Sequence, residues 1–357
     1  MKRPSSTSSS DAPSTPAPAA TPAPRKPGLL RWFAGVAFVA ALAVAGQFAI
    51  DALFPPPTPG YTLRTLANQC TKPVVFLGDS INATFDRDDE DPQTLAALVA
   101  AATGRKTGVV ALGGFDMQLF RNYAKSVQFR MDPADPKIWI LTVNLSNYAR
   151  DGRSPYVRNK LYIAEMNQLL HRPLRAFARP MRIFRFPSFR PTLREEEELR
   201  RPVLWQGRPI GLQRDFPDTH FKVSNVTDDL RRQNVIIRYA QPMTRGNRAL
   251  KATTEAARIL RRHGQRAVFC IMPCDVERCD ALLDGAISPI LDEKAALARA
   301  AAEAGGGEVL DLHDAFPHKW FVPDRYPNEH LRNPGREALA SAIASFLLTN
   351  TPPAPVR

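Results

Sequence analysis

A buried strand and the turn that ends it are predicted by Val74-Val75-Phe76-Leu77-Gly78-Asp79-Ser80-Ile81-Asn82. The first four residues are apolar and two are β-branched, which is typical of a short parallel strand buried on both faces. Ser80 is therefore expected on the first turn after the strand, at the edge of an open α/β sheet where ligands bind. A Gly-Asp-Ser tripeptide is also common turn chemistry, so this stretch alone leaves the role of Ser80 open.

Four further strands alternate with helices along the chain. Strands are predicted at residues 108–114, 139–144, 267–273 and 309–312, and helices at 94–102, 249–263 and 290–304, with a last amphipathic helix through Leu339, Ile343 and Leu347. Such alternation predicts a parallel sheet covered by helices on both faces.

Polar or glycine residues follow three of these strands. Gly113 and Gly114 end the second strand, and they fit either a tight turn or a backbone that donates to a substrate. Asn144 ends the third strand, where a side-chain amide could reach over Ser80, although an asparagine at this place is often only a cap. Because the carboxyl ends of parallel strands meet at one edge, these residues are expected to lie near Ser80.

Phe76-Leu77-Gly78-Asp79-Ser80 resembles the first sequence block of the SGNH/GDSL esterase superfamily, and His330-Leu331 followed by Gly335 resembles its last block. The resemblance implies an α/β, flavodoxin-like three-layer sandwich with Ser80 as nucleophile and His330 as base. It also implies an oxyanion hole made by Ser80, by Gly113 or Gly114, and by Asn144. The middle blocks match only loosely, because Ala111 and Leu112 stand ahead of the glycines and Leu145 follows Asn144.

The last block departs from the family at one position. Pro327 stands where the family has the aspartate that orients the histidine, and Asp324 lies three residues earlier. Either Asp324 completes a catalytic triad, or Ser80 and His330 work as a dyad with a backbone carbonyl holding the ring. A third alternative is that His330 is an unengaged surface histidine.

The N-terminal part of the 357-residue chain differs in composition from the rest. We expect residues 1–28 to be a disordered cytoplasmic tail, 29–54 a transmembrane anchor, 55–72 a linker, and 73–350 the SGNH-like domain. Basic residues precede the apolar run and none follows it closely, which favours a catalytic domain outside the inner membrane, in the periplasm or its equivalent. A signal peptide cleaved after residues 43–45 is the alternative.

The chain has four cysteines, Cys70, Cys270, Cys274 and Cys279. In an oxidising compartment an even number favours disulfides, and the short segment between Cys274 and Cys279 makes this pair the expected bridge. Four reduced, buried thiols are the alternative. A zinc site is disfavoured because no paired Cys-x-x-Cys or His-x-x-x-His accompanies them.

Residues 150–245 interrupt the α/β pattern and contribute to the net charge of +13. Arginines recur among phenylalanines between residues 172 and 194, which favours an insertion that flanks the site and attracts an anionic polymer or lipid headgroups. A solvated basic face is the alternative. Nucleic acid is disfavoured by the expected extracytoplasmic location.

A single anchor before an external SGNH-like domain resembles the membrane-anchored accessory proteins of alginate O-acetylation and teichoic acid D-alanylation. The resemblance implies a serine-dependent O-acyltransferase or esterase acting on an extracytoplasmic polysaccharide beside a membrane-bound O-acyltransferase. The alternative is a non-catalytic SGNH-like module that binds glycan or scaffolds such a complex. Nothing in the sequence calls for a metal or a cofactor.

The charge asymmetry around residues 32–50 generates a test of location. Alkaline phosphatase fused after residue 60 should be active in cells, because the enzyme folds only outside the cytoplasm. An inactive fusion that is produced at full length would contradict export of the domain.

Overall fold

The computed structural model describes residues 28–53, 68–83, 92–111, 115–128, 131–148, 200–212, 227–244, 246–323 and 329–349. The chain divides into two compact units, residues 1–54 and 55–357. In the first unit a single helix, α1 (Leu29–Leu53), occupies the segment predicted as an anchor. Large apolar side chains along it are exposed, among them Trp32, Phe33 and Phe38.

Among the described residues, no helix combines the length and the apolar character needed to cross a membrane. The structure therefore has a helix over residues 29–53 of the segment predicted as an anchor, and the transmembrane location of residues 29–54 stays a prediction. The side chains of residues 47–53 lie outside the described part of the chain, as do residues 1–27 of the predicted tail, residue 54 of the predicted anchor and residues 55–67 of the predicted linker.

The second unit is built on a five-stranded sheet. The strands are β1 (Val74–Gly78), β2 (Thr107–Ala111), β3 (Ile138–Val143), β6 (Arg266–Ile271) and β7 (Glu308–Asp311). Their order is β2-β1-β3-β6-β7, and every neighbouring pair is parallel. This is the strand order of flavodoxin-like sheets, so the five predicted strands and their parallel arrangement are confirmed.

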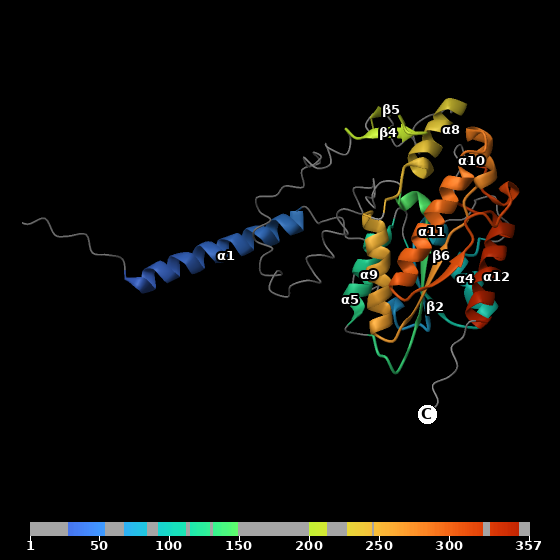
Figure 1. Ribbon diagram of the computed structural model, residues 1–357. Coiled ribbons are helices and arrows are strands. Elements are labelled where there is room, and N and C mark those ends of the chain that lie inside the picture. Colours follow the sequence, from blue (N-terminus) through green and yellow to red (C-terminus); the bar gives the residue numbers. More distant parts are fainter. Residues whose placement is uncertain are drawn as a thin grey trace, which may run out of the picture. The chain divides into compact units, whose positions relative to one another are not determined.

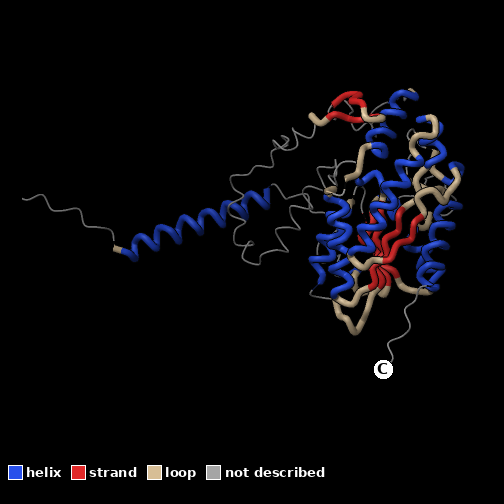
Figure 2. The backbone as a smooth tube through the Cα atoms, viewed as in Figure 1, coloured by secondary structure: helices blue, strands red, loops and turns tan. Residues whose placement is uncertain are grey.

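Helices cover both faces of the sheet, as Figures 1 and 2 show. Alternate residues of the central strands point to opposite sides: Val75 and Leu77 join one hydrophobic core, and Val74 and Phe76 the other. The first core is completed by α5 (Met117–Val127), α9 (Arg248–Arg262) and α11 (Ser288–Ala304), and the second by α4 (Leu95–Thr103) and α12 (Asn333–Thr349). The predicted three layers are therefore present.

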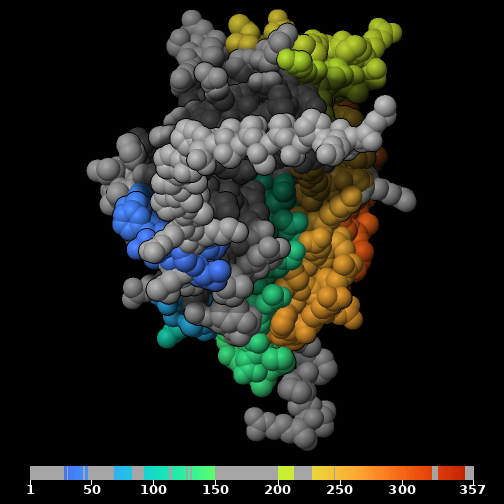
Figure 3. Space-filling model, turned by 90° about the vertical axis from the view of Figure 1, so that its left-hand side faces the viewer, coloured from blue at the N-terminus to red at the C-terminus, as the bar shows by residue number. Residues whose placement is uncertain are grey.

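Local sequence explains where the helices begin and end. The hydroxyl of Thr94 accepts from the backbone N–H of Ala97 at the start of α4, and Gly104 ends this helix at φ 66°. Asp116 caps α5 by accepting from two backbone N–H groups. Asn247 does the same for α9, which packs beside α5 on the face shown in Figure 3.

Part of residues 150–245 is described. It contains an antiparallel hairpin, β4 (Pro202–Trp205) and β5 (Arg208–Leu212), then α8 (Asp228–Val235) and a π-helical turn, η7 (Ile236–Ala240). Val235, Ile236 and Tyr239 are buried in the first core, so the end of this segment belongs to the packed domain. The arginine-rich residues 172–194 lie outside the described part of the chain.

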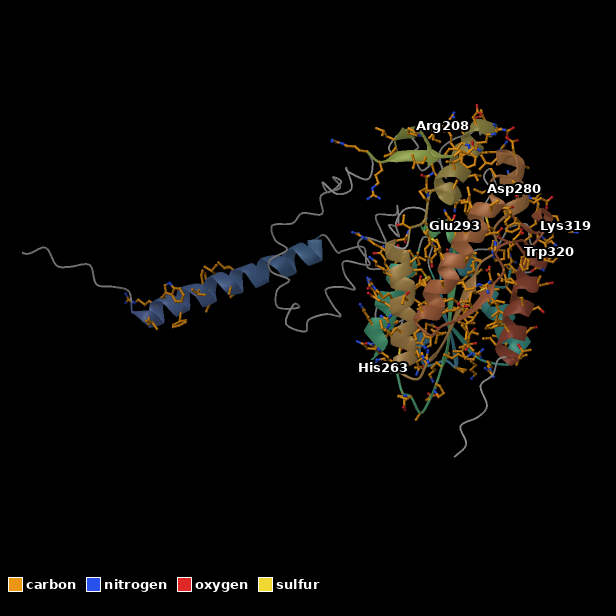
Figure 4. All side chains as sticks on the ribbon, viewed as in Figure 1. Arg208, His263, Asp280, Glu293, Lys319 and Trp320 are labelled. Carbon is orange, nitrogen blue, oxygen red and sulfur yellow. The ribbon has the colours of Figure 1, made fainter. Side chains whose placement is uncertain are left out.

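The remaining short elements lie at the carboxyl side of the strands. They are α3 (Ser80–Ala83), η2 (Leu145–Tyr148), α10 (Val276–Leu283) and η8 (His318–Trp320). Among the residues labelled in Figure 4, His263 precedes β6 and Asp280 follows it, so the two lie toward opposite ends of the strands.

The disulfide predicted between Cys274 and Cys279 is not formed, because the structure holds both residues as free thiols. The prediction assumed an open loop between the two residues. Instead, Asp275 caps α10 through the backbone N–H of Arg278, and Cys279 lies in the first turn of that helix. The Cys279 thiol and burial raise the pKa of Cys274, and Cys274 and Cys279 are both buried.

The packing of β2 generates a stability prediction. A Cβ on Gly108 would lie 2.2 Å from the backbone oxygen of Gln69, which cannot move like the end of a side chain. Gly108→Ala should therefore destabilise the protein by about 1–3 kcal/mol in urea unfolding. Gly246→Ala is the matched control, since its Cβ would have 3.7 Å to the nearest atom. Equal losses in the two variants would contradict this account.

Candidate functional site

The turn after β1 has no room for a side chain at Gly78. A Cβ there would lie 1.7 Å from Nδ2 of Asn82 and 2.9 Å from Oγ1 of Thr142. The amide of Asn82 is itself buried and donates to the Thr142 hydroxyl at 3.4 Å. Glycine therefore lets α3 begin directly against the end of β3, with Ser80 as its first residue.

Ser80 and His330 are brought together across 250 residues of sequence, with 2.9 Å between Oγ of Ser80 and Nε2 of His330. This distance is typical of a nucleophile and its general base. Both residues are half-buried, so the pair is held by the fold and still reaches solvent. With the ring proton on Nδ1, the hydroxyl donates to Nε2.

The backbone around His330 is tied to the segment after η8. Phe321 and Leu331 form an antiparallel bridge, and the N–H of Val322 donates to the carbonyl oxygen of His330 at 2.9 Å. Both bridging side chains are buried in the second core. The buried guanidinium of Arg336, on α12, donates to the carbonyl oxygen of Leu331 at 3.2 Å. The position of His330 therefore depends on core packing.

Glu329, the residue before His330, is a buried carboxylate that sequence reasoning missed. Only 3% of its surface is exposed. Arg238 donates to it from Nη2 at 3.1 Å, and the hydroxyl of Tyr239 also donates to it. Burial alone would raise the pKa of Glu329, but the positive charge of Arg238, the Tyr239 hydroxyl, His330 and Ser146 together lower it. Glu329 is therefore ionised at neutral pH.

Both partners of Glu329 come from η7, and the end of that turn is fixed by Gln241. The side-chain amide of Gln241 donates to the carbonyl oxygen of Ile236 at 2.9 Å, which is a backbone group of the turn itself. The same amide exchanges hydrogen bonds with the backbone N–H and carbonyl of Leu204 in β4. π-helical turns occur often at functional sites, and this one presents two consecutive side chains to one carboxylate.

Asp79 and Asn144 form a second polar group beside the pair. Nδ2 of Asn144 donates to Oδ2 of Asp79 at 3.4 Å, and Oδ1 of Asn144 accepts from the backbone N–H and the hydroxyl of Ser146. Burial raises the pKa of Asp79 to about 6, although the N–H of Ile81 opposes the rise. Asn144 therefore lies at the predicted strand end, with its amide directed to Asp79.

Three predicted site residues, Asp324, Gly113 and Gly114, lie outside the described part of the chain. Their roles stay predictions. In the ranges that the structure does describe, no group of three or more histidine, cysteine, aspartate or glutamate side chains is placed to hold a metal ion.

Comparison with known proteins found no matching family model and no curated protein with a similar sequence. Among solved structures, a mutant of an acetyl-xylooligosaccharide esterase from Geobacillus stearothermophilus is 12% identical, with a TM-score of 0.36 over 77% of this chain and 92% of that one. An α/β hydrolase from the metagenome of Lake Arreo, Spain, is 14% identical, with a TM-score of 0.37 over 76% and 93%. Likenesses of this strength assign neither a family nor an activity to the chain.

Proposed function

We propose that this protein is a serine-dependent esterase or O-acyltransferase of SGNH type. The observation that carries the proposal is the 2.9 Å hydrogen bond between Ser80 and His330 at the carboxyl edge of a parallel sheet. A serine hydroxyl is a weak nucleophile unless a base removes its proton as it attacks. The structure supplies that base at the required distance and leaves the pair partly exposed.

In the proposed reaction, Oγ of Ser80 attacks the carbonyl carbon of an acyl ester while its proton passes to Nε2 of His330. The tetrahedral intermediate collapses to an acyl-serine, and the protonated ring gives its proton to the departing alcohol. Water or a sugar hydroxyl then attacks the acyl-serine, with His330 taking and returning the proton again. The two acceptors distinguish hydrolysis from transfer.

The negative oxygen of the intermediate needs hydrogen-bond donors. We assign the backbone N–H groups of Ser80 and of Gly113 or Gly114 to this role. Asn144 could contribute the amide hydrogen that does not face Asp79, since an amide carries two. This assignment keeps Asn144 in place and needs no change in its bond to Asp79.

The proposed substrate is an acyl group, acetyl or similar, on an extracytoplasmic polysaccharide, and the proposed partner is a membrane-bound O-acyltransferase. Both follow from the resemblance to envelope acylation proteins and from the charge pattern of the N-terminal residues. The basic residues 150–245 suit an anionic polymer.

A fluorophosphonate probe tests the nucleophile. The probe should label Ser80 in the full chain, and Ser80→Ala should abolish both labelling and release of acyl groups from a p-nitrophenyl ester, a loss on the order of 10⁶-fold. His330→Ala should reduce activity as severely, because the hydroxyl then keeps its proton. Ser341→Ala, an exposed serine on α12, is the matched control. An unlabelled wild-type protein would favour the non-catalytic binding module.

Asp324→Asn distinguishes the triad from the dyad. If Asp324 holds the ring of His330 in the working tautomer, turnover should fall by on the order of 10⁴-fold while the fold stays intact. If His330 works in a dyad, turnover should change little. The measurement is ester hydrolysis together with acylation of the native polymer in cells.

A further inference from the structure

The carboxylate of Glu329 is unusual because it is ionised and almost completely buried beside a half-buried histidine. Burying a charge costs several kcal/mol unless partners compensate for the lost water. The fold supplies these partners from η7, through the guanidinium of Arg238 and the hydroxyl of Tyr239. The guanidinium also lies 5.5 Å from the centre of the Tyr239 ring. We therefore asked what the buried carboxylate of Glu329 does in the site.

We propose that Glu329 is a positioning residue for His330. The fixed negative charge of the Glu329 carboxylate stabilises the imidazolium that forms when Ser80 gives up its proton. The inference deepens the proposed function and assigns to a described residue the electrostatic task that the sequence gave to Asp324. Glu329 neither gains nor loses a proton in the step: the proton moves from Oγ of Ser80 to Nε2 of His330 and then to the departing alcohol.

Adjacency in the chain makes the coupling close. Glu329 immediately precedes His330, and a hydrogen bond to Val322 fixes the carbonyl of His330. Because the side chain of Glu329 is held by η7, the two residues are restrained from both sides. His330 is among the groups that lower the pKa of Glu329, and by reciprocity the carboxylate favours the charged form of the ring.

The charged and titratable groups near this pair come from several elements of the described chain. Arg238 and Tyr239 face Glu329 from η7, and Asp79 follows β1 with a pKa of about 6. The thiol of Cys274 lies near Glu329 and Tyr239. The ammonium of Lys294 donates to the carbonyl oxygen of Tyr239. Burial raises the pKa of Asp79 and the charge of Glu329 adds to the rise, so Asp79 gains a proton as the pH falls through about 6. Glu329, which has its own cation, is the permanent anion of the group.

The decisive variant is Glu329→Gln, which keeps the shape and the hydrogen-bond acceptor but removes the charge. In histidine-labelled full-length protein followed by NMR, the ring of His330 should titrate at a pH lower by about one unit or more than in the wild type. In p-nitrophenyl ester hydrolysis, kcat should fall by about tenfold or more, since one pKa unit corresponds to a factor of ten, with KM little changed. The acid limb of the pH–rate profile should move to lower pH by the same amount as the titration of the His330 ring.

Glu308→Gln is the matched control. Glu308 is also paired with an arginine, at 2.7 Å from Arg266, but it begins β7 and so lies at the amino edge of the sheet. The Glu308→Gln substitution should leave the titration of His330 unchanged. Glu329→Asp, which keeps the charge on a shorter side chain, serves if the glutamine variant fails to fold. In Glu329→Asp the pH at which His330 titrates should fall by less than about one unit, because the negative charge is kept.

An unchanged titration of His330 in Glu329→Gln would overturn the inference, and so would a fall of about one pH unit or more in Glu329→Asp, which keeps the charge. So would a shift produced by Asp324→Asn alone. The NMR measurement does not depend on turnover, so the inference can fail while Ser80 still labels with fluorophosphonate, and it can hold in a protein that does not hydrolyse esters.

Discussion

Burial of β1 on both faces is the constraint from which the rest of the domain follows. All five of its residues are buried, so the chain must place helices on each side of the sheet. Parallel strands then need long crossover connections, and their carboxyl ends collect at one edge. Ser80, Asn144 and the loop that carries His330 meet there because of this topology. The absence of a Cβ at Gly78 completes the arrangement, since it lets the first turn of α3 pack against Thr142.

The site contains two buried carboxyl groups, Asp79 and Glu329, whose surroundings shift their pKa values in opposite directions. Asp79 is buried with hydrogen bonds but no cation at its side in the described residues, and burial raises its pKa to about 6. Glu329 is equally buried but is paired with Arg238, which lowers its pKa. The fold therefore separates a carboxylate that can lose its charge from one that keeps it. Both lie close to a serine and histidine already in contact.

The sequence predicted the five strands, the helices on both faces and the meeting of Ser80 with His330, because apolar runs and sequence blocks are local signals. It did not predict Glu329 as a site residue, since its partners lie 91 and 90 residues earlier in a segment that resembled a basic insertion. It was wrong about the disulfide, because nothing in the spacing of Cys274 and Cys279 shows that a helix begins between them. A lone Asn144 likewise could not indicate that its amide meets Asp79.

The π-helical turn η7 also restricts how the length of this chain can vary. An α-helix advances about 100° per residue, and a π-helical turn behaves as an α-helix with one residue inserted. Deleting that residue would rotate one end of the segment by about 100° relative to the other. Gln241 anchors the turn to Leu204, and the buried side chains of Val235 and Ile236 anchor its start, so neither end is free to turn. Surface loops tolerate insertions and deletions among homologous proteins. Between α8 and Gln241, by contrast, the number of residues is as constrained as their identity.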